Sequence, residues 1–144
     1  MSERTPQQIG RANRRAGKDA QLAGAAKART LGYPNAAYEV RNGSSDIIGT
    51  GDLAIEVTTT GWDKIWIKLD QAARDAKRRG LDAYCVWKKR NGKTDMGEGA
   101  IIIPAKLFLP MMADLDAYRR TEMDAQLQFE RGYRLGREAR EDTA

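Results

Sequence analysis

The sequence predicts a single-domain α/β protein, and three observations lead to this expectation. The chain has 144 residues, of which 41% are hydrophobic, so it is long enough to bury one core. Residues 53–57 alternate between faces as a strand does. Residues 60–79 place apolar side chains at the spacing of a helix with one buried face.

The predicted elements alternate between helix and strand over the first 104 residues. In order they are a helix (17–31), a strand (36–41), a turn (42–46), a strand (53–57), a helix (60–79), a strand (82–90), a loop (91–99) and a strand (100–104). The first helix is rich in alanine, and Gly32 and Pro34 stop it, while Gly80 stops the second.

The strand over 53–57 separates a carboxylate from its apolar neighbours. Side chains alternate along a strand, so Ile55 and Val57 share one face and Glu56 points to the other. In the helix that follows, Ile65, Leu69, Ala72, Ala73 and Ala76 form the apolar face, and Lys64, Lys68, Gln71 and Asp75 form an arc beside it.

Further features are expected at the start of the second helix and in the C-terminal part of the chain. Thr60 and Asp63 resemble a capping box, with Asp in place of Glu. Two more helices are expected over 104–118 and 122–140. The main domain is therefore assigned to residues 1–120, and residues 121–144 to a C-terminal helical extension.

Composition excludes several kinds of chemistry. Cys85 is the only cysteine and histidine is absent, which excludes zinc sites built on these residues, nucleophiles paired with histidine, and disulfides. Cys85 is expected to be a small buried hydrophobe. No long apolar run and no apolar signal core are present, so we expect a soluble, cytoplasmic protein that lies in the host cytoplasm if it is viral and contacts no membrane.

Positive charge gathers in two parts of the chain. Residues 1–34 hold seven basic and two acidic residues, and residues 74–93 hold eight basic and two acidic residues. Separate basic patches predict a polyanionic partner such as DNA. The candidate phosphate contacts are Arg11, Arg14, Arg15, Lys18, Arg41, Lys88, Lys89, Arg90 and Lys93. Solvated helix faces and tails are the alternative interpretation.

Three ordered stretches resemble one nuclease superfamily. They are "SSDIIGTGDLAIEV" (44–57), "GWDKIWIKLDQAARDA" (61–76) and "YCVWKKRNGK" (84–93). Together they resemble the PD-(D/E)xK nucleases, and within them the small Holliday junction resolvases of phages and archaea. The resemblance covers about residues 10 to 110. It implies a restriction-endonuclease-like mixed sheet flanked by helices, and a homodimer that cuts branched DNA, four-way junctions above all, with Mg²⁺ or Mn²⁺.

The resemblance also assigns the site. By comparison with the family, Asp46 and Glu56 hold the metal ion, together with the main-chain carbonyl of Val57. Asp52 is the competing acid, but its place after Gly51 favours a turn or strand-entry role. The alternative for the pair is a surface turn and an exposed strand position.

The chain departs from the family motif at one catalytic position. The motif has lysine two residues after the glutamate, where this chain has Thr58. A threonine cannot supply the charge of an ammonium group. Lys64 and Lys68 are the expected replacements, followed by Lys88, and Gln71 is expected to serve the same site. In the first helix, where the family carries a glutamate, this chain offers Asp19 and Gln21, with Gln21 expected to bind a metal-held water only weakly.

Three alternatives remain open. The protein binds DNA without cutting it, the motif is aligned wrongly, or basic helices contact an acidic protein partner. The three tryptophans, Trp62, Trp66 and Trp87, are expected to pack in the core or in a dimer interface rather than to stack on bases.

Overall fold

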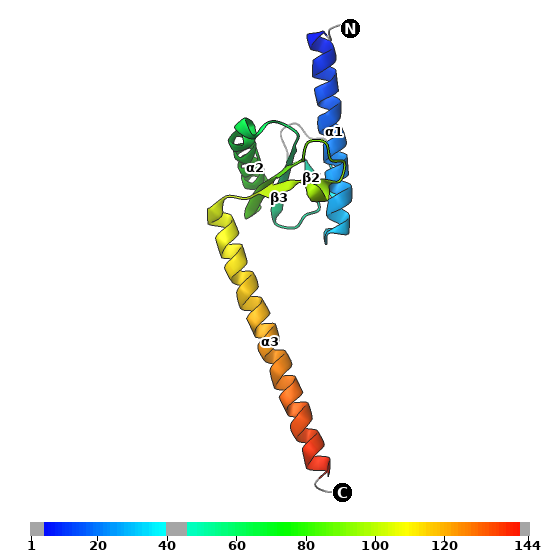
Figure 1. Cartoon of the computed structure of the whole chain (residues 1–144). Coiled ribbons are helices and arrows are strands. Elements are labelled where there is room, and N and C mark those ends of the chain that lie inside the picture. Colours follow the sequence, from blue (N-terminus) through cyan, green and yellow to red (C-terminus); the bar gives the residue numbers. More distant parts are fainter. Residues whose placement is uncertain (1–4, 40–45, 142–144) are drawn as a thin grey trace. The chain divides into compact units, whose positions relative to one another are not determined.

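The structure, a computed structural model, describes residues 5–39 and 46–141, with side chains described as far as residue 137. Figure 1 shows its elements. They are α1 (Pro6–Thr30), β1 (Ala37–Tyr38), β2 (Ile47–Ile48), β3 (Leu53–Thr58), the 3-10 turn η1 (Trp62–Lys64), α2 (Ile65–Arg79), β4 (Ala83–Lys88), the 3-10 turn η2 (Met96–Glu98), β5 (Ala100–Ile102) and α3 (Ala105–Glu141).

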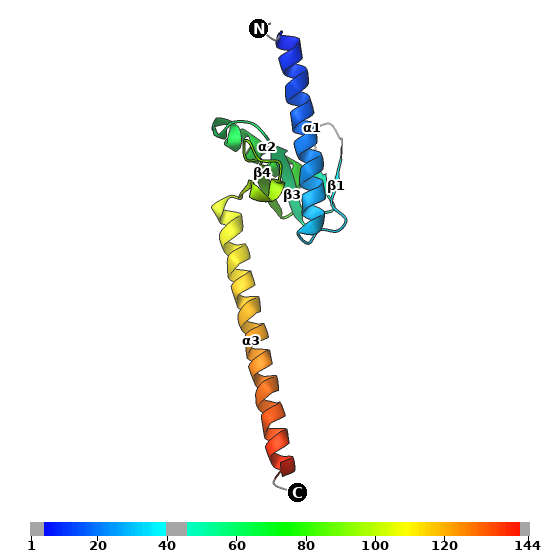
Figure 2. The ribbon, with the colours of Figure 1, turned by 45° about the vertical axis from the view of Figure 1, so that its right-hand side comes forward.

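The five strands form one mixed sheet in the order β1-β2-β3-β4-β5. Neighbouring strands are antiparallel except β3 and β4, which run parallel along six paired residues. Figure 2 shows these two strands side by side. The parallel pair is joined through α2, as the connection between parallel strands requires. The predicted α/β class and mixed sheet are therefore confirmed.

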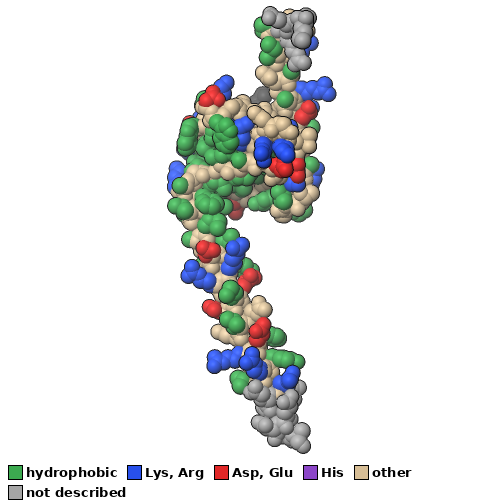
Figure 3. Space-filling model, in the orientation of Figure 1, with side chains coloured by type: hydrophobic (Ala, Val, Ile, Leu, Met, Phe, Trp, Pro, Cys, Tyr) green, Lys and Arg blue, Asp and Glu red, His purple; other side chains and the backbone are tan. Residues whose placement is uncertain are grey.

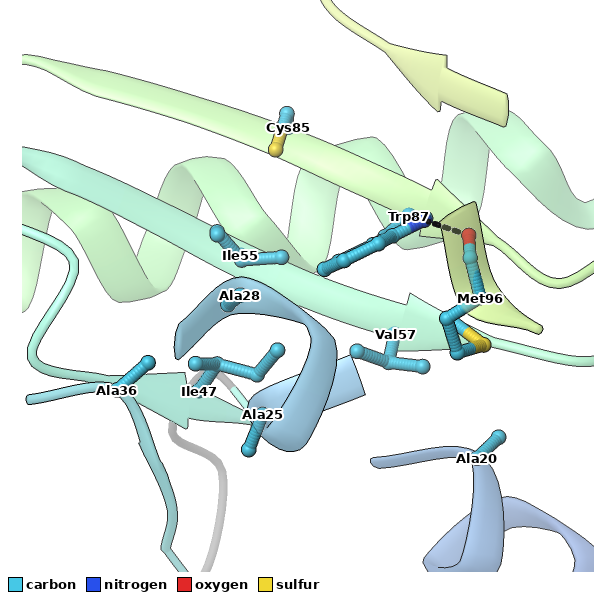
Figure 4. Close-up of a cluster of buried hydrophobic side chains, with 10 residues drawn as sticks. All are labelled: Ala20, Ala25, Ala28, Ala36, Ile47, Ile55, Val57, Cys85, Trp87 and Met96. Carbon is cyan, nitrogen blue, oxygen red and sulfur yellow. Dashed lines mark hydrogen bonds between the residues drawn. The ribbon is translucent and has the colours of Figure 1, made fainter. Parts of the chain in front are cut away.

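The sheet carries a helix on each face, with α1 and α2 on opposite sides in Figure 1. The α1 face is the larger core, where Ile47, Ile55 and Val57 pack with alanines of α1 and with Trp87 (Figure 4). The indole of Trp87 donates a hydrogen bond to the Met96 carbonyl, 3.0 Å away. Cys85 is fully buried in this core, as predicted.

The α2 face holds a smaller cluster. Ile65 and Leu69 of α2 pack on Val86 of β4, whose side chain points away from the α1 face. Glu56 pairs with Val86 in the parallel register and shares its face. The predicted alternation along β3 therefore places Glu56 beneath α2.

α1 begins eleven residues earlier than the helix expected over 17–31. Thr5 accepts a hydrogen bond from the Gln8 amide, and the Gln8 side chain accepts one from Thr5, which is a complete capping box with Pro6 in the first turn. The sequence "TPQQ" carried this signal. Only the later part of α1 packs on the sheet, at Ala20, Gly24, Ala25 and Ala28.

Other boundaries also differ from the expectations. The strand expected over 36–41 is described only at Ala37–Tyr38, residues 40–45 lie outside the described residues, and the short β2 was not predicted. The capping box expected at Thr60 does not form. The Thr60 hydroxyl lies 2.8 Å from the Thr58 hydroxyl instead, and α2 follows a 3-10 turn at Ile65.

The described residues fall into two compact units that divide after Pro104. The second unit contains α3, one continuous helix that includes Pro110. The break expected between helices at residues 119–121 is absent, so the domain boundary placed at 120/121 falls inside α3. Among the described residues, no helix is both long and apolar enough to cross a membrane.

The turn after β2 predicts one effect on stability. Gly49 has φ +75°, and a Cβ atom there would clash with the Asn35 carbonyl. Gly92 has the same φ, but no atom lies within 4 Å of its Cβ position. Alanine at Gly92 should lower the free energy of unfolding by about 1–2 kcal/mol through backbone strain alone. Gly49→Ala should lower it by about 3 kcal/mol or more.

Urea denaturation of both variants measures the difference. Equal losses in Gly49→Ala and Gly92→Ala would show that the close approach to Asn35 does not constrain this turn.

Candidate functional site

Asp46, which directly precedes β2, and Glu56 of the neighbouring strand β3 lie beside each other. The antiparallel register pairs Ile47 of β2 with Ile55 of β3. One further step along each strand brings the two acids opposite each other. Asp46 and Glu56 are each only 8% exposed. The pair is therefore not the exposed turn and exposed strand position of the alternative interpretation.

Two donors from different elements hold the Asp46 carboxylate. The Val57 amide of β3 donates to Oδ2 at 2.7 Å, and the Gln21 side chain of α1 donates to Oδ1 at 2.5 Å. Gln21 therefore orients a carboxylate directly, a contact that the sequence did not predict. The signal was present in α1, because Arg14, Lys18 and Gln21 recur at the spacing of one helical stripe.

Lys68 is the lysine that reaches the acids. Its Nζ lies 3.0 Å from Glu56 Oε1, with one quarter of the Lys68 side chain exposed. Gln71, also on α2, and Lys64, which ends η1, are exposed. Of these candidates, Lys68 alone contacts either acid among the described residues, because its turn of α2 lies over Glu56.

Asp75 is a third acid close to the pair. It is 2% exposed, and it forms ion pairs with Arg78 at 2.9 Å and Arg79 at 3.3 Å. Its charge contributes to raising the pKa of Asp46 and of Glu56. Asp75 shares the helical arc of Lys68, which was the sequence signal for its position.

Burial changes the acidity of both carboxyls. Removal from water raises the pKa of Asp46 to about 7, and the neighbouring Glu56 charge adds to the effect, while the Val57 amide opposes it. Burial also raises the pKa of Glu56, and Lys68 opposes that shift. The two acids therefore resist carrying two negative charges together unless a cation is close.

Thr58 occupies the motif position on the face that carries Glu56. It is 3% exposed, and its hydroxyl is bonded to Thr60 rather than directed to an acid. Its partner in the parallel register is Lys88 of β4, which is 5% exposed. The Lys88 ammonium lies 5.9 Å from the centre of the Trp62 ring and donates to the Lys89 carbonyl at 3.3 Å. Lys88 therefore contacts neither acid.

The Val57 backbone faces Asp46. In a strand, the N–H and C=O of one residue point to the same edge, and the Val57 N–H points to Asp46. The Val57 carbonyl therefore also faces this edge of β3. The predicted set of Asp46, Glu56 and this carbonyl shares one region of the sheet.

These oxygens suit Mg²⁺ rather than a soft metal. Mg²⁺ is typically held by one or two carboxylates, with water and substrate phosphate as the other ligands. Two mutually repelling carboxylates with raised pKa values match that donor set. Within residues 5–39 and 46–137, no cluster of three or more acidic or cysteine side chains is arranged to hold a metal.

The predicted DNA contacts fall into separate groups. Arg11, Arg14, Arg15 and Lys18 are exposed on α1, with Arg15 4.0 Å from Asp19. Lys88 is buried at the end of β4, Lys89 and Arg90 follow it, and Lys93 lies 3.4 Å from Glu98. Arg41 lies outside the described residues.

The predictions for Asp52 and the three tryptophans have different outcomes. Asp52 is exposed in the turn before β3, as its turn role predicted. Trp87 is a core residue, whereas Trp62 and Trp66 are 65% and 75% exposed. Trp62 and Trp66 therefore do not pack in the core of the single chain, and the dimer interface remains a prediction for them.

Comparisons with protein-family models, curated proteins and solved structures find no significant match to this chain.

The raised pKa of Asp46 predicts a pH-dependent stability. Its ordinary pKa is 3.8, against about 7 in the folded chain. Between these values the folded state binds a proton that the unfolded state releases. The free energy of unfolding should therefore fall as pH rises from about 4 to about 7, by at most about 1.4 kcal/mol per pH unit. Urea denaturation in EDTA at several pH values measures this slope.

Asp46→Asn should flatten the slope because the titrating carboxyl is removed. Asp52→Asn is the matched control, since it removes an exposed acid six residues away and should leave the slope unchanged. An undiminished slope in Asp46→Asn would assign the titration to another group, such as Glu56, whose pKa burial also raises.

Proposed function

We propose that this protein is a metal-dependent endodeoxyribonuclease with a restriction-endonuclease-like fold, and that its substrate is branched DNA such as a four-way Holliday junction. The observation that supports this most strongly is the buried pair of Asp46 and Glu56 with the Lys68 ammonium beside it. An acid pair and an amine are the groups that the PD-(D/E)xK motif uses.

The side chains divide the work of phosphodiester hydrolysis. Asp46, Glu56 and the Val57 carbonyl would hold Mg²⁺, which supplies a Lewis acid and an activated water when bound. Gln21 fixes the orientation of Asp46. Lys68 donates hydrogen bonds and positive charge where the phosphate gains negative charge. Lys68 thus takes the place of the motif lysine that Thr58 replaces, since α2 crosses the same face of the sheet.

The basic stripe of α1 supports DNA as the partner. Arg11, Arg14 and Lys18 continue to Gln21 along one side of the helix, and the ten residue steps from the first to the last span about 15 Å. A phosphate backbone bound along this stripe leads to Asp46. Acids at the end of a phosphate track repel the DNA unless a cation lies between them.

A second copy of the chain completes the proposal. Resolving a four-way junction requires two incisions in strands of like polarity. A two-fold symmetric homodimer supplies two such sites at once.

DNA binding without cleavage is the second candidate, and one observation favours it. The position of the motif lysine is occupied by Thr58, whose hydroxyl is bonded to Thr60 just after β3. If the ion pair with Lys68 serves only to neutralise Glu56, the fold keeps its basic surfaces and lacks turnover.

Cleavage assays separate the two candidates. Wild-type protein with a labelled four-way junction and Mg²⁺ or Mn²⁺ should give paired nicks, and EDTA should abolish them. Asp46→Asn and Glu56→Gln should lower the rate about 100-fold or more while junction binding persists, because the metal ligands are lost and the basic surfaces remain.

Asp52→Asn is the matched control for charge, and it should cleave as wild type does. If the wild type binds the junction and does not cleave it, the result supports DNA binding without cleavage. Full activity in Asp46→Asn or Glu56→Gln would discard the assigned site.

Lys68 is predicted to supply the catalytic amine. Lys68→Ala should lower kcat about 100- to 1,000-fold, because an ammonium group aimed at developing charge is lost. Lys64→Ala, one helical turn earlier and exposed, should change kcat less than about threefold. Single-turnover cleavage of the junction measures both. A larger loss in Lys64→Ala would move the amine to that residue.

A further inference from the structure

A surface groove opens at the carboxyl ends of the parallel strands. It has a volume of about 520 Å³ and is lined by residues 59–62, 88–91 and 98–100. These segments follow β3, end β4 and lead into β5. The ends of parallel strands are where α/β folds usually bind ligands, because the connecting loops diverge there.

An aromatic ring and basic side chains give the groove its chemistry. Trp62 is 65% exposed, although tryptophan is usually buried. Within the described part of the chain, Lys89 and Arg90 have no carboxylate within ion-pairing distance, whereas the one acid of the groove, Glu98, is paired with Lys93 at 3.4 Å. The groove therefore offers a stacking surface and unneutralised positive charge.

The surroundings of Lys88 indicate that the ligand of the groove is an anion. Its ammonium lies in the wall of the groove on a residue that is 5% exposed. Its neighbours are the Lys89 carbonyl and one face of the Trp62 ring. Neither carries a full negative charge, and a buried ammonium usually has a charged partner.

We propose that this groove binds one unpaired nucleotide of a DNA strand. The base stacks on the face of Trp62 that Lys88 does not cover, and the adjoining phosphate supplies the anion for the Lys88 ammonium and contacts Lys89 and Arg90. A base within a duplex is stacked on both faces and cannot offer one to a tryptophan, so the groove selects DNA with an unpaired nucleotide.

This inference rests on the proposed function and narrows its substrate. Thr58 and Lys88 pair across β3 and β4 at the groove, two residues beyond Glu56. At about 3.3 Å per residue, the groove begins about 7 Å along the strand from that acid. An unpaired nucleotide held here would place the neighbouring phosphate at the acid pair, so branch points that expose a base are the substrates expected to be cut.

Binding in EDTA tests the groove without any cleavage. Fluorescence anisotropy would follow a labelled ten-nucleotide oligothymidylate and a blunt duplex of the same length. Trp62→Ala should weaken binding of the single strand roughly 5- to 150-fold, the effect of losing one base–aromatic stack. Duplex affinity should change less than about twofold. Trp62→Phe keeps a ring and should lose less than Trp62→Ala.

Trp66→Ala is the matched control, because Trp66 is also exposed on the same segment and lies outside the groove lining. It should bind the single strand as wild type does. The Lys89→Ala, Arg90→Ala double variant should flatten the salt dependence of single-strand binding, because two phosphate contacts are lost.

Wild-type affinity for the single strand in Trp62→Ala, or equal losses in Trp62→Ala and Trp66→Ala, would overturn the groove assignment. That result leaves the nuclease proposal intact if the junction is cleaved. Conversely, a selective loss in Trp62→Ala supports the groove even if the junction is never cleaved, so the two proposals fail separately.

Discussion

The pairing of β2 with β3 forces two carboxylates of like charge together in a place that water hardly reaches. Such a pair is unfavourable by itself, because each charge loses hydration and repels the other. The structure offsets the repulsion with donors from three elements: the Val57 amide of β3, Gln21 of α1 and Lys68 of α2. The short strand β2 and both flanking helices are thus linked to one electrostatic arrangement.

The same arrangement allows an amine to reach Glu56 although residue 58 is a threonine. A lysine at position 58 would emerge on the face of the sheet that carries Glu56, and α2 covers that face. An amine on α2 can therefore approach the acid from above instead of along the strand, and Lys68 does so. The Thr58 hydroxyl bonds to Thr60 instead, at the edge of the groove beside Trp62 and Lys88.

Basic surfaces approach the acids from two directions within the first unit. The stripe on α1 ends at Gln21, and the groove begins beyond Glu56. The proposed substrate strand would therefore meet positive charge on both sides of the pair. α3 is different in kind, since Figure 3 shows hydrophobic and charged side chains interspersed along its described part. Its large apolar residues are exposed, with Phe129 at 75%.

The sequence by itself determined the α/β class, the position of β3 and the face on which Glu56 points, because periodicity and strand alternation are local properties. The resemblance also proposed Asp46 and Glu56 as one site, with Lys64 or Lys68 as the amine beside it. The predictions missed β2, the early start of α1 and the exposure of Trp62. Only the tertiary structure decided that Lys68 reaches Glu56 while Lys64 does not, that Gln21 holds Asp46, and that the acids are buried. Those outcomes depend on how two helices pack on opposite faces of a sheet, and spacing along the chain does not encode contacts between elements.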